Sequence, residues 1–146
     1  MKLTTTWKGK MLLEASDGTH SAMMDAKPPF GQDTAMSPKQ LLLAAITGCT
    51  GVDVISLLRK HKQDLQSFSI AAEADPREEY PKIFKEILLD FFLTGAIDSE
   101  IAIAAVADSQ SKYCSVSAMV SKASPIRYRI YINDMLVHED QARFAF

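Results

Sequence analysis

The stretch Ser37-Pro38-Lys39-Gln40-Leu41-Leu42-Leu43-Ala44-Ala45-Ile46-Thr47-Gly48-Cys49-Thr50 opens the longest helix that the sequence predicts. Ser37 is a favourable N-cap residue, Pro38 suits the first helical position, and Gln40 completes a capping box. Apolar residues then recur at steps of three and four, and basic residues follow near the end. We therefore expect one helix over residues 37–62. Because its first half is apolar on nearly every side, we expect this helix to be buried.

Strands are predicted on both sides of this helix. Before it, Asp17-Gly18 is a hairpin signal within a three-stranded meander at residues 2–8, 11–15 and 20–24. After it come three more strands, expected to be antiparallel, at residues 68–73, 84–94 and 127–132. A second helix is expected at residues 99–112, with a short helical continuation at 114–121. The sequence has no internal repeat and no linker. We therefore predict one α+β domain spanning residues 1–146.

Charge and terminal sequence narrow the function classes. The 146 residues carry 16 basic and 18 acidic side chains, a net charge of −2. Because non-specific nucleic-acid binding needs a basic surface, we expect no nucleic-acid partner. The N-terminus lacks the apolar core of a signal peptide, and the nearly uncharged stretch 41–52 is shorter than the ~20 residues of a membrane span. We therefore expect a cytoplasmic protein with no membrane partner.

The two cysteines, Cys49 and Cys114, are the only plausible reactive pair in the sequence. One interpretation is that both are inert core residues, since free cysteine is among the most buried residue types. Gly48 and Gly51, however, flank Cys49 within the helix, where each glycine costs ~1 kcal/mol relative to alanine. This cost suggests that a partner chain, a ligand or the second sulfur approaches the helix closely there.

Other chemistries have weaker support in the sequence. His20, His61 and His138 are scattered, and no Cys/His pair has the spacing of metal ligands. There is no G-x-S-x-G element of a serine hydrolase and no glycine-rich phosphate loop. The sequence therefore indicates no metal site and no bound cofactor.

Three segments together resemble one known family. The stretch at 37–50 resembles the central-helix signature of the OsmC/Ohr proteins, Lys112-Tyr113-Cys114-Ser115-Val116 resembles their second-cysteine signature, and Pro81-Lys82-Ile83-Phe84 also matches. The resemblance implies an α+β fold of two intertwined subunits, a homodimer with sites at its interface. It implies a thiol peroxidase that reduces organic hydroperoxides, with Cys49 as the peroxidatic and Cys114 as the resolving cysteine. An external dithiol, such as that of a lipoyl group, would be the reductant. No metal, flavin or haem would be required.

Two departures from the family pattern concern the activation of the thiol. The peroxidase members use an arginine from the N-terminal strand region, but the first arginine here is Arg59. They also carry a glutamate just after the helix-start proline, where this chain has Lys39. The resemblance therefore leaves Lys8, Lys10 or Lys39 to supply the cation, and a lysine lacks the bidentate geometry of a guanidinium.

Three functions follow as hypotheses. The first is a cysteine-based hydroperoxide reductase. The second is a binding protein for a hydrophobic small molecule without efficient peroxidase activity, which the missing Arg–Glu pair favours. The third, a structural dimeric scaffold, explains the two cysteine motifs least well.

Overall fold

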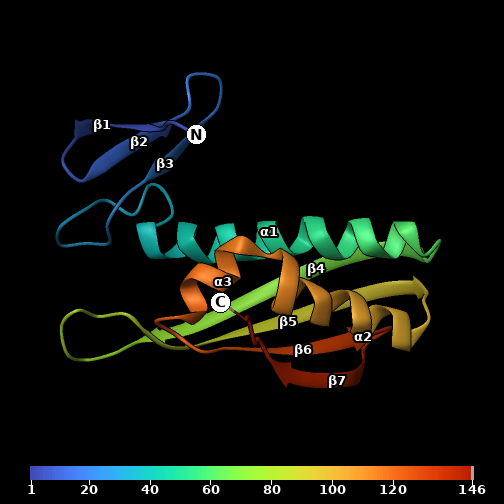
Figure 1. Cartoon of the computed structure of the whole chain (residues 1–146). Coiled ribbons are helices and arrows are strands. Elements are labelled where there is room, and N and C mark those ends of the chain that lie inside the picture. The colour runs from blue at the N-terminus through green and yellow to red at the C-terminus, as the bar shows by residue number, and fades with distance from the viewer. Residues whose placement is uncertain (146) are drawn as a thin grey trace. The chain divides into compact units, whose positions relative to one another are not determined.

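The computed structural model describes residues 1–145, which form two compact units, and the chain passes from the first to the second between Ala44 and Ala45. Figure 1 labels the helices and strands of both units. The first unit is a three-stranded antiparallel meander of β1 (Thr4–Gly9), β2 (Leu12–Ser16) and β3 (Ser21–Met24). The predicted hairpin turn is confirmed, because Asp17 Oδ1 accepts the backbone N–H groups of Thr19 and His20 at 2.8 and 2.7 Å.

Helix α1 (Pro38–Lys60) begins with the predicted capping box. The backbone N–H of Ser37 donates to Gln40 Oε1 at 2.8 Å, and the N–H of Gln40 donates to Ser37 Oγ at 3.3 Å. The helix ends two residues earlier than predicted. Lys62 has a φ of +55°, which a right-handed helix cannot accommodate.

The second unit contains a four-stranded sheet in the order β4-β5-β6-β7, formed by Asp64–Pro76, Phe84–Ala96, Ile126–Ile132 and Met135–Gln141. The pair β4–β5 is antiparallel, as predicted, and β6 pairs antiparallel with β7, a strand that the sequence did not predict. The antiparallel prediction is wrong for β5 and β6, which run parallel. Parallel neighbours require a crossover connection. The chain supplies one through three helical segments, α2 (Ser99–Asp108), η1 (Ser109–Tyr113) and α3 (Ser115–Ser121).

The core of the second unit lies between this sheet and the helices, which cover one of its faces (Figure 1). Alternate side chains of β5 point into the core, and Phe91 and Leu89 are fully buried there. Tyr128 and Ile130 of β6 line the same layer. Burial of these apolar side chains is the main stabilising contribution, at about 25 cal/mol per Å² of apolar surface.

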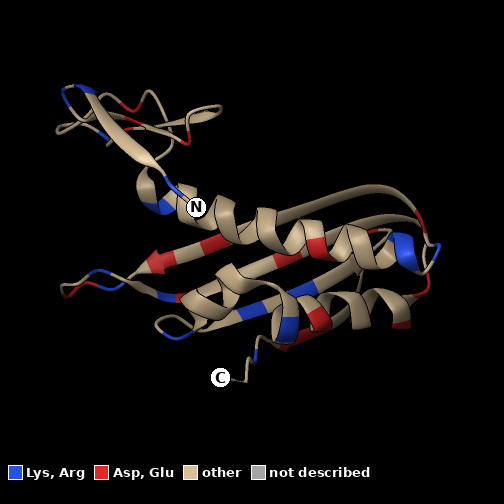
Figure 2. Cartoon of the chain, turned by 45° about the horizontal axis from the view of Figure 1, so that its top comes forward, with Lys and Arg blue, Asp and Glu red and all other residues tan. Residues whose placement is uncertain are grey.

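The opposite face of the sheet carries paired charges, and Figure 2 shows acidic and basic residues on neighbouring strands. Arg129 donates two hydrogen bonds to the carboxylate of Asp90, each 2.6 Å long. This pairing raises the pKa of the Arg129 guanidinium, chiefly through the hydrogen bonds to Asp90. The face also carries Phe92, whose ring stacks on Tyr131 with the centroids 5.0 Å apart.

Within the chain, helix α1 is buried on one side, whereas the sequence predicts burial on nearly every side. Its buried residues are Ile46, Thr50, Gly51, Val54 and Leu58. On another side, Val52 is 67% exposed. Apolar composition shows that a helix can be buried on every side, but it does not show what packs there. In the second unit, α1 packs one side against the sheet, and Val52 on another side stays exposed. By length and composition α1 could also cross a membrane, a property that core helices of soluble proteins share.

Candidate active site

The two cysteines come together in the second unit. Cys49 lies in the middle of α1, and Cys114 directly precedes α3. Their sulfur atoms lie within 4.8 Å of each other. Cys49 is partly exposed, Cys114 is fully buried, and both are free thiols. The structure therefore brings together the two residues that the sequence singles out, although 65 positions separate them in the chain.

A π-helical turn, η1, positions Cys114. The N–H of Cys114 donates to the carbonyl of Ser109 at 3.0 Å, a bond that spans five residues. Cys114 then adopts an extended conformation and becomes the N-cap of α3, where its sulfur accepts the N–H of Ser117 at 3.3 Å. π-Helical turns are rare and occur frequently at functional sites. No pattern in the sequence indicated this one.

Four polar residues beside the cysteines, in two hydrogen-bonded pairs, were not identified from the sequence as site residues. Asp53 follows Cys49 by one helical turn, and its carboxylate accepts a hydrogen bond of 3.0 Å from the hydroxyl of Ser109. Gln110 donates a hydrogen bond of 2.8 Å to the hydroxyl of Thr50. The spacing of Cys49 and Asp53, four residues apart on one helix, is the sequence signal that could have found the acid.

Two buried oxygens near the dithiol have no hydrogen-bond partner among the described residues. They are Gln110 Oε1 and Ser117 Oγ. Both residues are almost completely buried, at 1% and 0% exposure. Buried polar groups without partners are rare and cost about 1–3 kcal/mol each. The surroundings of the cysteines are therefore polar and incompletely satisfied, unlike the apolar core against the sheet.

Burial is the largest influence on the Cys49 thiol and raises its pKa above the ordinary value of 9.0. The neighbouring Cys114 and the negative charge of Asp53 raise it as well. A hydrogen bond from the backbone N–H of Val116 lowers it, but by less. Among the described residues, no cation contributes to the pKa of this thiol.

The three lysines left as candidates for the activating cation lie in the first unit of the chain. Lys8 lies there in an ion pair with Glu14, with Nζ and Oε2 2.7 Å apart. Lys10 adopts a positive φ of +50° after β1, and Lys39 is exposed in the first turn of α1. The cysteines lie in the second unit. The role of these lysines stays a prediction.

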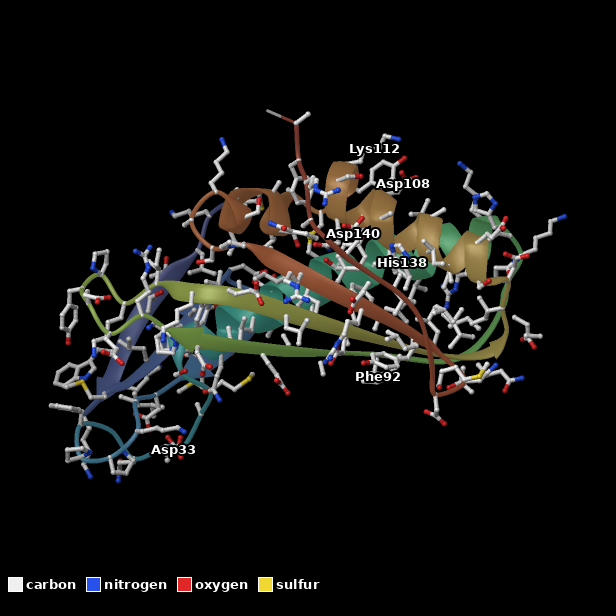
Figure 3. The ribbon with its side chains drawn as sticks, turned by 90° about the horizontal axis from the view of Figure 1, so that it is seen from below. Asp33, Phe92, Asp108, Lys112, His138 and Asp140 are labelled. Atoms are coloured by element: carbon white, nitrogen blue, oxygen red, sulfur yellow. The ribbon has the colours of Figure 1, made fainter. Side chains whose placement is uncertain are left out.

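A small surface pocket lies beside Asp53. It has a volume of about 180 Å³ and is lined by Asp53, Ser56, Leu57 and Tyr113. A second pocket of about 150 Å³ lies between α1 and α2 and extends to Asp108, whose carboxylate faces Lys112 on the surface (Figure 3). A larger cavity of about 510 Å³ lies along β4 and β5, and none of the cysteine-cluster residues lines it.

No close contact among the described residues requires glycine at Gly48 or Gly51 of α1. A Cβ atom at Gly51 would lie 3.5 Å from the Phe68 ring and 3.7 Å from Ile70, which are ordinary contacts. A Cβ atom at Gly48 would meet no other described atom within 4 Å. The close approach that the glycines predict is therefore not made at Gly48 by the described residues.

Comparisons with known proteins agree with this arrangement. A family model described as OsmC-like protein matches residues 31–129. The Protein YhfA of Escherichia coli (strain K12) is 35% identical over 130 residues, which cover 88% of this chain and 95% of the relative.

Solved structures share the fold. A hypothetical protein from Aquifex aeolicus VF5 has a TM-score of 0.81 at 26% identity, with 90% of this chain and 95% of that chain covered. An organic hydroperoxide resistance protein OsmC from Legionella pneumophila has a TM-score of 0.62 at 16% identity, covering 90% and 94%. The second likeness concerns the α+β fold alone. With the family match spanning residues 31–129, this chain belongs to the OsmC-like protein family.

Proposed function

We propose that this protein is a thiol-dependent peroxidase that reduces organic hydroperoxides. The observation that carries the proposal is the placement of the Cys49 and Cys114 sulfurs within 4.8 Å of each other. A disulfide requires sulfur atoms about 2.05 Å apart. The two sulfurs therefore need only a local movement to bond, although they come from segments far apart in the sequence.

The proposed cycle uses no prosthetic group. The Cys49 thiolate attacks one peroxide oxygen, the O–O bond breaks, and the alkoxide leaves as an alcohol after taking up a proton. Cys49 is then a sulfenic acid, and the Cys114 thiol condenses with it to form a disulfide and release water. An external dithiol, for which a lipoyl group is suitable, reduces the disulfide and is itself oxidised.

The pocket beside Asp53 supports an organic substrate. Leu57 and Tyr113 give this pocket apolar walls, and its volume of about 180 Å³ suits a short alkyl or aryl group. Burial of such a group contributes about 25 cal/mol per Å², which hydrogen peroxide cannot gain. We therefore propose alkyl and aryl hydroperoxides as the substrate class.

Activation of Cys49 is the demanding step, because the thiolate is the nucleophile and the thiol form is favoured here. The N–H of Val116 offsets part of this effect. We propose that a cation, from Lys8, Lys10 or Lys39, approaches the sulfur in the intertwined homodimer that the family resemblance implies. The exposed side of α1 around Val52 is consistent with a partner subunit. We place the protein in the cytoplasm, where dithiol reductants keep it active.

The second candidate function is binding of a hydrophobic small molecule without efficient peroxidase activity. The raised pKa of Cys49 favours it, because a protonated thiol reacts slowly with peroxide. In this case the cysteines line a pocket and remain reduced. The two candidates differ in whether peroxide consumes the thiols.

An assay of turnover separates the two candidates. Cumene hydroperoxide is mixed with dihydrolipoamide and either wild type, Cys49→Ser or Cys114→Ser protein, and peroxide loss is followed. We expect turnover by wild type, none above buffer with Cys49→Ser, and trappable sulfenic acid with Cys114→Ser. Ser67→Ala, an exposed change on β4 that lies outside the pocket beside Asp53, is the matched control for folding. Peroxide loss that Cys49→Ser leaves unchanged contradicts the proposal.

A further inference from the structure

We propose that Cys49, Asp53 and Cys114 form a binding site for a thiophilic divalent cation of the zinc type in the reduced protein. One ligand atom from each residue lies within 4.8 Å of the others. Two sulfur ligands of one tetrahedral zinc lie about 3.8 Å apart, given Zn–S bonds of about 2.3 Å. The three side chains therefore need only small adjustments to surround one ion.

The three donors suit zinc chemically. Two thiolates and one carboxylate give a mixed sulfur and oxygen set, which zinc accepts, whereas magnesium and calcium prefer oxygen alone. The cation would displace both thiol protons, and three negative ligands would then surround a charge of +2. A fourth tetrahedral position would remain for water.

The local structure prepares the ligands. Cys49 and Asp53 are four residues apart on α1, so that their side chains lie on the same side of the helix, a spacing that zinc-binding helices use. The hydroxyl of Ser109 donates to Asp53 Oδ2 at 3.0 Å and leaves Oδ1 available to the ion. Such an orienting contact to a ligand is typical of zinc sites.

The site also has a route of entry. Cys49 and Asp53 are partly exposed, and Asp53 borders the pocket of about 180 Å³. Cys114 closes the inner side and is fully buried. The sequence indicates no metal motif because the third donor lies 61 positions beyond Asp53. Cys114 comes within reach directly after the π-helical turn.

Cobalt(II) is the probe for this proposal, because thiolate ligands give it a charge-transfer absorption that other ligands do not. Anaerobic, fully reduced protein without peroxide is titrated with Co²⁺, and Zn²⁺ is then added. We expect one Co²⁺ per chain with thiolate absorption and its displacement by Zn²⁺. A Co²⁺ titration of the wild type that gives no thiolate absorption overturns the proposal. This readout does not depend on peroxidase turnover, so the two proposals can fail separately.

Variants test each donor. Asp53→Asn keeps the shape of the side chain, and we expect it to weaken Co²⁺ binding about tenfold or more; Ser109→Ala should weaken it by about 10–100-fold. Asp108→Asn is the matched control, because Asp108 pairs with Lys112 on the surface at 3.7 Å. This variant should bind Co²⁺ as tightly as the wild type does. Equal affinities for wild type and Asp53→Asn overturn the proposed ligand set. X-ray absorption of the zinc-loaded protein should find two sulfur neighbours, and oxygen or nitrogen neighbours alone contradict it.

Discussion

The second unit contains two regions of opposite character that share helix α1. Against the sheet, α1 contributes Val54 and Leu58 to an apolar layer that includes Phe91. Toward η1 and α3, the same helix contributes Cys49 and Asp53 to a polar cluster, which includes buried oxygens that have no hydrogen-bond partner within residues 1–145. The first region gains stability from burial, whereas the second retains polar groups that cost stability. The chain therefore tolerates a cost in stability at the candidate site that it does not bear in the apolar layer.

The largest expected effect concerns the apolar layer. Phe91 is fully buried and its ring packs against Phe68 and Tyr128, with centroids 6.4 and 6.3 Å away. We expect Phe91→Ala to lower the free energy of unfolding by about 3–5 kcal/mol, measured by urea denaturation. The control is the next residue, Phe92→Ala, on the opposite face and 38% exposed, which should cost clearly less (Figure 3). Equal losses would show that the two faces contribute alike.

The next effect concerns the hydrogen bond between Gln110 and Thr50. Thr50→Val removes the acceptor and leaves the buried amide of Gln110 without a partner. We expect a loss of about 1–3 kcal/mol in the free energy of unfolding. The double variant Thr50→Val/Gln110→Leu should recover part of this loss, because it removes both polar groups. The exposed change Thr94→Val is the control, and a double variant as unstable as the sum of both single variants contradicts the interpretation.

The third effect is the pH dependence of Cys49. Folding raises the pKa of Cys49 above 9.0, so the unfolded chain loses this proton at a lower pH than the folded chain does. The contribution of this thiol to stability is therefore complete below pH 9 and falls as the pH rises above 9. With burial and its neighbours alone acting on the thiol, alkylation should accelerate about tenfold per pH unit up to the raised pKa, whereas the lysine proposed above would lower this pKa in the dimer and bring the plateau to a lower pH. Iodoacetamide labelling of wild type, read by peptide mass spectrometry, measures the rate at each pH. A plateau already at neutral pH would reveal an activating cation.

The smallest effect concerns the exposed side of α1. Gly48 costs the helix ~1 kcal/mol relative to alanine, and within the described chain a Cβ atom there has space. We expect Gly48→Ala to raise the free energy of unfolding by up to about 1 kcal/mol. Thermal unfolding at low and high protein concentration measures it. Destabilisation that grows with concentration would instead show that a partner subunit packs against this position.

The sequence predicts most of the fold because its signals are local. The capping box at Ser37 and Gln40 and the turn at Asp17 are contained in a few residues, and both form as expected. Strand β7 was missed, although Asn133 and Asp134 both take positive φ in the turn before it. Such a turn joins two adjacent strands in a hairpin, and this dipeptide was the available signal.

The candidate site was only partly predictable. Cys49 and Cys114 were identified as a pair, but their contacts with Asp53 and Ser109 depend on how α1 and η1 pack. The five-residue hydrogen bond that forms the π-helical turn leaves no periodic trace in the sequence. The raised pKa of Cys49 likewise arises from burial and from neighbours distant in sequence, so no local pattern could have indicated it.

The sulfur of Cys114 also caps the seven-residue helix α3 by accepting the N–H of Ser117. A disulfide with Cys49 would pull this sulfur toward α1 and weaken the cap. In the proposed cycle, the oxidation state of this sulfur would thereby be coupled to the order of residues 115–121. Oxidised protein should consequently expose the backbone amides of residues 115–121 to solvent more readily than reduced protein does. A reductase could distinguish the two forms by this difference.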